Sequence, residues 1–256
     1  MYPLNWSSDK NNFDLSSLKV GFILPAFNEY ENIFILLKQI ESNFSTDFFN
    51  HSDHISHPEF SAKKSKNDVG GIYVIDRPGA AQSVIRAGHL TIPRDHQDYF
   101  SLSFANYVLG GEYSSRVNMN LRQDKGYSYG FYSSIDWGHH SSSWLIRGSV
   151  QTEVTFESIK EIILEIDGIH GSKPITSTEF EDSKQGLLKG IPSQFESSNQ
   201  MLNQLIKLVQ FNLSDDDFSE SIKKIEALSL DEVNLASNNH FKPNESVIVI
   251  VGDKEK

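Results

Sequence analysis

The feature that most constrains the fold of this chain is the order in which strand-like and helix-like patterns follow one another. Patterns typical of strands occupy residues 72–75, 81–91, 127–137, 143–152 and 246–251. The last of these, SVIVIV, is apolar throughout, which predicts a strand buried on both faces. Helical periodicity separates the second strand from the third and fills residues 156–239. The order predicts an α+β fold, with a mainly antiparallel sheet and helices packed on one face.

The chain divides into three parts by pattern. Residues 1–44 contain a short apolar strand at 18–24 and an amphipathic helix at 31–43, which we interpret as a remnant of a preceding unit. Residues 45–71 are polar and weakly periodic, which is typical of a linker. Residues 72–256 form one continuous α+β domain.

The linker contains His51, His54 and His57 at a regular three-residue spacing. Histidines three apart can share one helix face and ligate a metal, so a cryptic metal site with independent peptidase activity is one interpretation. A solvated polar linker is the interpretation we favour, because no carboxylate or fourth histidine stands nearby in a helix-forming context.

Composition excludes several classes of protein. The 256 residues carry 23 basic and 34 acidic side chains, a net charge of −11, which is unsuited to binding nucleic acid or an anionic membrane. The absence of cysteine excludes disulfide scaffolds, thiolate metal sites and cysteine nucleophiles. No apolar run approaches the ~18 residues of a membrane span. We expect a soluble chain, in the cytoplasm, or in a bacterial periplasm if a signal lies on a missing N-terminal part.

No self-sufficient catalytic motif is present. The patterns GxSxG, GxGxxG, HExxH and HxxEH and the P-loop are all absent. His139 and His140 are adjacent, so on a strand they would point to opposite faces and not share one ion. The sequence therefore predicts no catalytic residue and no metal ligand in this chain.

Two stretches carry a family resemblance. The first is DRPGAAQS at 76–83, leading into VIRAGH at 84–89; the second is YVLGG at 107–111, SSR at 114–116 and LRQDKGYSYG at 121–130. Together with GIP at 190–192 and the closing SVIVIVGD, they resemble the pitrilysin/insulinase family of zinc metallopeptidases, the inverzincins. The similarity is to the C-terminal, non-zinc half, as in bacterial members of the mitochondrial processing peptidase type.

The resemblance implies a division of labour between two α+β halves. In this family the N-terminal half carries HxxEH and a distant glutamate, which bind zinc, and the C-terminal half closes over the peptide substrate. We therefore expect a chain that is inactive alone and works with a zinc-bearing HxxEH half or subunit. It would be a fragment, a mis-joined reading frame or a natural non-catalytic subunit.

The resemblance also implies substrate-binding residues. In the family an arginine and a tyrosine of the C-terminal half reach the backbone of the bound peptide and help to stabilise the oxyanion. The matching positions are Arg122 and either Tyr127 or Tyr129, with Tyr129 favoured by family spacing. The two tyrosines are two apart on a predicted strand, so we expect them to face the same side. The alternative is that Arg122 pairs with Asp124 or a helix carbonyl and the tyrosines pack the sheet.

Other residues of the matching stretches receive simpler interpretations. Gln82 and Arg86 lie on the strand after Pro78 and either line the substrate chamber or follow from one-sided burial of the strand. The pair at 110–111 is predicted to stop a helix. Arg116 is predicted to form a structural ion pair.

Two alternative functions remain. One is a scaffold subunit of such a complex without substrate contact. The other concerns LPAFNE at 24–29, which follows a strand, opens a helix and resembles the start of family-two glycosyltransferases. That class needs paired aspartates on later strands to hold a divalent ion, and nothing comparable follows in the sequence.

Overall fold

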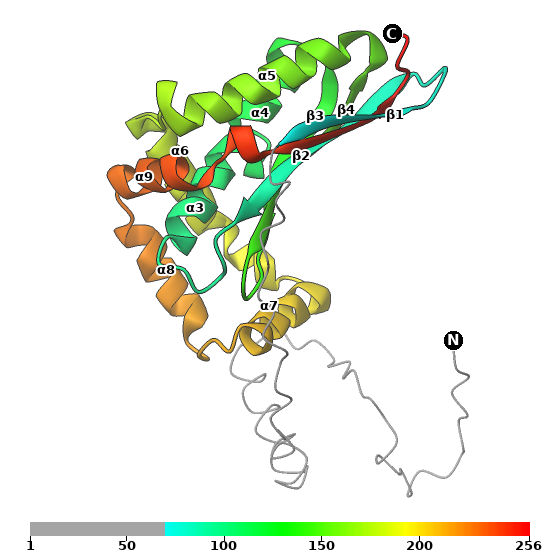
Figure 1. The fold of residues 1–256 in the computed structure, drawn as a ribbon. Coiled ribbons are helices and arrows are strands. Elements are labelled where there is room, and N and C mark those ends of the chain that lie inside the picture. Colours follow the sequence, from blue (N-terminus) through cyan, green and yellow to red (C-terminus); the bar gives the residue numbers. More distant parts are fainter. Residues whose placement is uncertain (1–69) are drawn as a thin grey trace, which may run out of the picture.

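A computed structural model describes residues 70–256 of the chain (Figure 1). The predictions for residues 1–44, for most of the linker at 45–71, for the three linker histidines and for the glycosyltransferase-like stretch lie outside the described residues. Within the described part, no helix is both long and apolar enough to cross a membrane.

The described residues contain one five-stranded sheet. Its strands are β1 (Gly71–Asp76), β2 (Gln82–Thr91), β3 (Ser128–Asp136), β4 (Ser142–Gln151) and β5 (Val247–Gly252), in the spatial order β1-β5-β2-β4-β3. Only the pairing of β1 with β5 is parallel. The predicted α+β class with a mainly antiparallel sheet is confirmed, and each strand predicted between residues 72 and 256 is present.

Helices cover one face of this sheet (Figure 1). They are α3 (Tyr99–Asn106), α4 (Arg116–Asn118), α5 (Thr155–Asp167), α6 (Ser177–Gly190), α7 (Ser198–Gln210), α8 (Asp217–Ala227) and α9 (Leu230–His240). Capping boxes begin α6 at Thr176 and α9 at Ser229, each paired with a glutamate three residues later. Two π-helical segments, η2 (Tyr107–Gly111) and η3 (Met119–Asp124), extend α3 and α4.

The core lies between the helices and the covered face of the sheet. Its largest fully buried side chains include Trp144, Phe104 and Phe131. Asn106 at the end of α3 is also buried, and its side-chain oxygen accepts hydrogen bonds from Trp144 Nε1 (2.9 Å) and Ser133 Oγ (2.7 Å). Because a buried polar group is costly unless it is paired, this shared acceptor fixes α3 on β3 and β4.

The other face of the sheet bears no helix among residues 70–256, and we call it the open face (Figure 1). On β5, Ile248 and Ile250 are buried on the covered face, whereas Val247 is 41% exposed on the open one. The prediction that 246–251 is buried on both faces was therefore wrong for the described structure. The apolar sequence of β5 reflects its position inside the sheet, between β1 and β2. It does not mean that other elements cover both faces of the strand.

Candidate functional site: the open face and the start of β3

Arg122 is positioned by the π-helical segment η3. The widened turn is visible in the hydrogen bond from the Lys125 N–H to the Asn120 carbonyl (3.0 Å), which spans five residues. Gly126 then reverses the chain with a positive φ of 67°. The Tyr127 N–H donates to the Leu121 carbonyl (2.8 Å), which anchors the start of β3 against this segment. Arg122 is thereby held beside the beginning of an edge strand.

The guanidinium group of Arg122 has no ion pair among the described residues. It lies over the ring of Tyr113, whose centroid is 4.6 Å from Cζ. Tyr113 in turn accepts a hydrogen bond at its hydroxyl from Gln123 Nε2 (2.6 Å). The expected alternative, a pairing of Arg122 with Asp124, is not seen. The cation–π contact orients the side chain and leaves its N–H donors uncommitted.

The two tyrosines that follow have different environments. Tyr127 precedes β3 and packs against the core, whereas Tyr129 is 89% exposed. The expectation that both face one side was wrong, because the register of β3 against β4 shifts between Ser128 and Phe131. Ser128 stabilises this bulge, since its hydroxyl donates to the Ser149 carbonyl (2.8 Å) and accepts from the Gly130 N–H (3.0 Å). The bulge carries Tyr129 into solvent.

A row of side chains crosses the open face in register. Arg86 on β2 stands directly opposite Arg147 on β4, with Tyr132 of β3 beyond Arg147 and Val249 of β5 beyond Arg86. Neither arginine has an ion pair within residues 70–256. Like charges placed directly opposite each other are unfavourable in a sheet, so this pair suits a ligand rich in carbonyl or carboxylate oxygens. Gln82 also lies on β2 and is exposed.

Arg147 was not singled out from the sequence. Strand alternation alone places it on the polar side of the 143–152 segment, but nothing in the sequence says that its cross-strand neighbour is Arg86. That pairing depends on the register between β2 and β4, whose partners are about 60 residues apart in the chain. Only the three-dimensional structure brings the two charges together.

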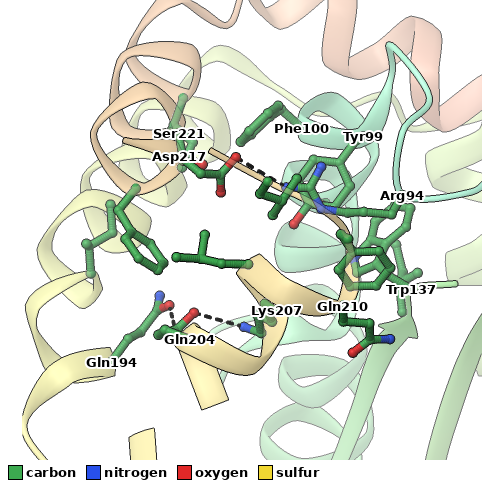
Figure 2. A pocket seen from close by; sticks show the side chains of 18 of the residues that line it. Arg94, Tyr99, Phe100, Trp137, Gln194, Gln204, Lys207, Gln210, Asp217 and Ser221 are labelled. Carbon is green, nitrogen blue, oxygen red and sulfur yellow. Dashed lines mark hydrogen bonds and ion pairs between the residues drawn. The ribbon is translucent and has the colours of Figure 1, made fainter. Parts of the chain in front are cut away.

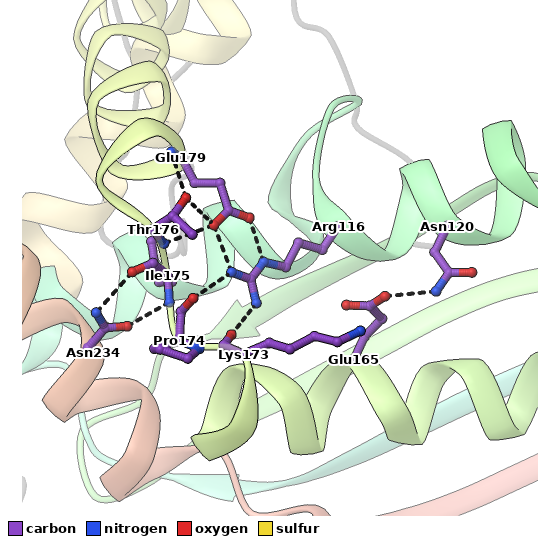
Figure 3. A network of polar contacts seen from close by, with 9 residues as sticks. All are labelled: Arg116, Asn120, Glu165, Lys173, Pro174, Ile175, Thr176, Glu179 and Asn234. Carbon is purple, nitrogen blue, oxygen red and sulfur yellow. Dashed lines mark hydrogen bonds and ion pairs between the residues drawn. The ribbon is translucent and has the colours of Figure 1, made fainter.

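Arg116, six residues before Arg122, is fully engaged in structural contacts (Figure 3). Its guanidinium makes a two-pronged pair with Glu179 (2.6 and 2.7 Å) and donates to the carbonyls of Lys173 (2.6 Å) and Pro174 (3.0 Å). Partial burial alone would raise the pKa of the Glu179 carboxyl, but hydrogen bonds from Arg116 and Thr176 outweigh it and lower the pKa to about 2. The predicted structural ion pair of Arg116 is confirmed.

Comparison with known proteins identifies the family. Residues 35–187, more than half of the chain, match the family described as "Peptidase M16 inactive domain". This chain belongs to the peptidase M16 inactive-domain family. The predicted resemblance to the non-zinc half of the pitrilysin/insulinase-type peptidases is thereby confirmed.

Two curated bacterial relatives are longer than this chain. It is 29% identical over 160 residues to the "Uncharacterized zinc protease YmxG" of Bacillus subtilis and 27% identical over 164 residues to the "Non-peptidase homolog YmxG" of Helicobacter pylori. The matches cover 60% and 62% of this chain but only 38% and 37% of those relatives. The M16 domain thus spans well under half the length of the curated relatives that it matches.

Solved structures show the same fold. The crystal structure of a peptidase M16 inactive domain from Pseudomonas fluorescens superposes with a TM-score of 0.65 at 24% identity, covering 72% of this chain and 44% of that one. A protease from Helicobacter pylori gives 0.65 at 19% identity, covering 73% and 45%. At these identities the likeness establishes the fold.

The residues of this M16 domain do not fit the zinc site of the peptidase family. The sequence contains no HxxEH, and the open face presents arginines, tyrosines and aliphatic side chains, none of which is a usual zinc ligand. His139 and His140 lie in the connection between β3 and β4 and are exposed. The open face therefore offers no ligand set for the zinc ion of this family.

The M16 domain also contains a cavity of about 510 Å³ on the helix-covered side of the sheet (Figure 2). Its walls come from the beginning of α3, the end of β3 and the helices α6, α7 and α8. Arg94 lies over the ring of Tyr99, 3.6 Å from its centroid, and faces Asp217 at 3.8 Å. None of the predicted substrate-binding residues lines this cavity.

Proposed function

We propose that this M16 inactive domain binds extended peptides on its open face and holds them against a zinc site carried by another half or subunit. It would be non-catalytic alone. The observation that carries this proposal is the uncommitted guanidinium of Arg122, which is oriented by Tyr113 at 4.6 Å but has no ion pair among residues 70–256. An arginine kept for structure, such as Arg116, has its donors occupied.

The chemistry of the surrounding surface supports a peptide ligand. A guanidinium group offers several fixed N–H donors, which suit the carbonyl oxygens of an extended backbone. Tyr129 adds an exposed hydroxyl from the bulge at the start of β3, and the row formed by Arg86 and Arg147 adds further donors across the sheet. Valines between these polar groups provide the apolar contacts that side chains of a peptide need.

A partner half is the second element of the proposal. Beyond its family membership, this chain presents a large exposed surface on which Tyr73, Ile75, Val84 and Tyr132 are each at least 37% exposed. Exposed apolar side chains gathered on one face are typical of a surface that another body covers. A zinc-bearing HxxEH half that closes over this face would bury both the peptide-binding surface and the bound peptide.

The test combines peptide binding with peptide cleavage. Binding of a fluorescein-labelled unstructured peptide is followed by anisotropy, and its cleavage is followed with HxxEH-bearing M16 halves from the same organism, with and without this chain. We expect stimulation by the chain and at least a tenfold loss of stimulation in Arg122→Ala. Arg77→Ala, at the exposed turn after β1, is the matched control and should leave stimulation unchanged.

The conservative variant Arg122→Lys separates charge from geometry. It keeps the positive charge but loses the planar fork of donors, so we expect it to resemble Arg122→Ala more than the wild type. Absence of stimulation with every HxxEH half, or full stimulation by Arg122→Ala, would remove the basis of the proposal.

A scaffold role without substrate contact is the second candidate function. It is favoured by the description of the Helicobacter pylori relative as a non-peptidase homologue. In this case Arg122→Ala would leave cleavage by the complex unchanged, while omission of the chain would dissociate the complex. Size-exclusion chromatography of the mixture beside the cleavage assay distinguishes the two functions.

A further inference from the structure

Two histidines and an aspartate come together at the end of the molecule where α3 begins and α9 ends. His96 lies in the loop between β2 and α3, Asp98 directly precedes α3, and His240 is the last residue of α9. His240 is 142 residues from Asp98 in the chain, so only the packing of α3 against α9 brings them together. None of the three belongs to the peptide-binding surface proposed above.

The donor atoms of this cluster have spacings close to those of a metal site. His240 Nε2 lies 2.7 Å and His96 Nδ1 3.9 Å from Asp98 Oδ2, and one donor atom from each residue lies within 4.8 Å of the other two. A tetrahedral ion with bonds of ~2.1 Å places its donors ~3.4 Å apart. The observed distances bracket that value, so movements of about 1 Å would bring the three donors onto one ion.

The protonation of His96 also suits a ligand. Its Nδ1 accepts a hydrogen bond from the Asp98 N–H (3.1 Å), so this nitrogen carries a lone pair and no proton in the neutral ring. An incoming ion would exchange this hydrogen bond for coordination. The rings of His96 and His240 meet edge to face, with centroids 5.4 Å apart.

The cluster is accessible to solvent, and nearby basic residues do not repel a metal cation from it. The side chains of His96 and Asp98 are 33% and 27% exposed, which leaves room for an ion to enter with water. The basic residues on the same two connections are already matched by carboxylates, since Arg94 faces Asp217 (3.8 Å) and Lys242 faces Glu245 (3.4 Å).

We propose that His96, Asp98 and His240 bind one divalent transition-metal ion such as Zn²⁺, with water completing the coordination. Two imidazole nitrogens and one carboxylate oxygen suit zinc, cobalt, nickel or copper, whereas magnesium and calcium prefer oxygen ligands alone. The ion ties the beginning of α3 to the end of α9 and stabilises the helical layer.

The same contacts also serve a metal-free protein, in which His240 and Asp98 form a hydrogen-bonded pair. The role of His96 distinguishes the two situations. In the metal-free case the His96 side chain contributes only local contacts, a hydrogen bond within its own loop and an edge-to-face contact with His240, so its removal would not change the affinity for zinc. In the metal site it supplies one of three ligands, so its removal weakens zinc binding strongly.

The experiment measures zinc binding to the full chain, without a polyhistidine tag, after treatment with EDTA and exhaustive dialysis. Isothermal titration with ZnCl₂ gives affinity and stoichiometry, and Co²⁺ absorption reports a tetrahedral environment. We expect one ion per chain, a rise in the unfolding temperature with zinc, and at least tenfold weaker binding in His96→Gln and His240→Gln.

Two control variants address histidines outside the cluster that stand close together in the sequence. The triple variant H51Q/H54Q/H57Q removes those of the polar linker, and His139→Gln with His140→Gln removes the exposed pair between β3 and β4; both should bind zinc within twofold of wild type. If His240→Gln fails to fold, His96→Gln decides. Absence of zinc binding in the wild type, or less than tenfold weakening in His96→Gln, overturns the proposal.

Discussion

The pairing of Arg116 with Glu179 offers a quantitative test of how the helical layer is held together. The contact joins the beginning of α4 to α6, and the same arginine donates to the carbonyls of Lys173 and Pro174 just before α6 (Figure 3). Arg116→Met keeps an unbranched apolar chain about as long as the aliphatic stem of arginine and removes all of these hydrogen bonds. Glu179→Gln keeps an acceptor for the capping box and removes the charge.

The magnitude follows from the pKa of Glu179, which is lowered from 4.5 to about 2. At about 1.4 kcal/mol per unit, the full difference corresponds to about 3 kcal/mol. The Glu179 side chain is 32% exposed, so solvent screening reduces this, and we expect about 1–2 kcal/mol of coupling between the two residues. A lowered folded-state pKa means that the contribution is complete above pH 4.5 and is lost as the pH falls toward 2.

A double-mutant cycle isolates the coupling from the other hydrogen bonds of Arg116. The free energy of unfolding of the wild type, both single variants and the double variant is measured by urea titration with circular dichroism at pH 7 and pH 3. We expect about 1–2 kcal/mol at pH 7 and less than half of that at pH 3. The control is Lys223→Met, which removes an exposed pair with Glu220 in α8 and should leave the free energy of unfolding within experimental error of the wild type.

The reasoning is refuted if the coupling at pH 7 is below about 0.5 kcal/mol, the range of ordinary surface pairs. It is equally refuted if the coupling does not decrease between pH 7 and pH 3, because the contribution would then not come from the ionised carboxylate.

Two further predictions concern the core. Asn106→Leu should lower the free energy of unfolding by about 2–4 kcal/mol, because Trp144 Nε1 and the Ser133 hydroxyl lose their shared buried acceptor; urea titration followed by tryptophan fluorescence measures it. Gly148→Ala should cost about 1–3 kcal/mol by the same titration, since the added Cβ would overlap the fully buried ring of Phe131.

A matched control exists for the glycine. Gly190 is the last residue of α6, and a Cβ there would meet nothing within 4 Å. Gly190→Ala should therefore leave stability unchanged or raise it by up to about 1 kcal/mol. Similar losses for both glycine variants would contradict the steric argument, and an Asn106→Leu protein as stable as wild type would contradict the hydrogen-bond argument.

Most of the fold could be predicted from local patterns. The strands β2, β3 and β4 alternate or are rich in β-branched and aromatic residues, and residues 156–239 follow helical spacing. The placement of β5 between β1 and β2 could not be predicted, because it depends on contacts between the two ends of the described chain. Local propensity carries no information about such distant pairings.

The wrong prediction for the two tyrosines has a clear physical origin. Alternation predicted that Tyr127 and Tyr129 share a face, but one extra residue in β3 changes the side on which the following residues project. The serine at 128 that holds this bulge is an ordinary strand residue in the sequence. A bulge is set by the register of the neighbouring strand, so a single-strand pattern cannot reveal it.

The arginines show how the fold assigns different roles to the same side chain. Arg116 and Arg122 lie on successive parts of one helical segment, and the sequence gives each a nearby polar neighbour. The fold brings Glu179, 63 residues away, to Arg116 but brings no carboxylate within ion-pair distance of Arg122 among residues 70–256. Arg122 forms no ion pair and only a cation–π contact with Tyr113, so replacing it should reduce function and leave folding largely intact. Replacing Arg116 should instead reduce the stability of the fold.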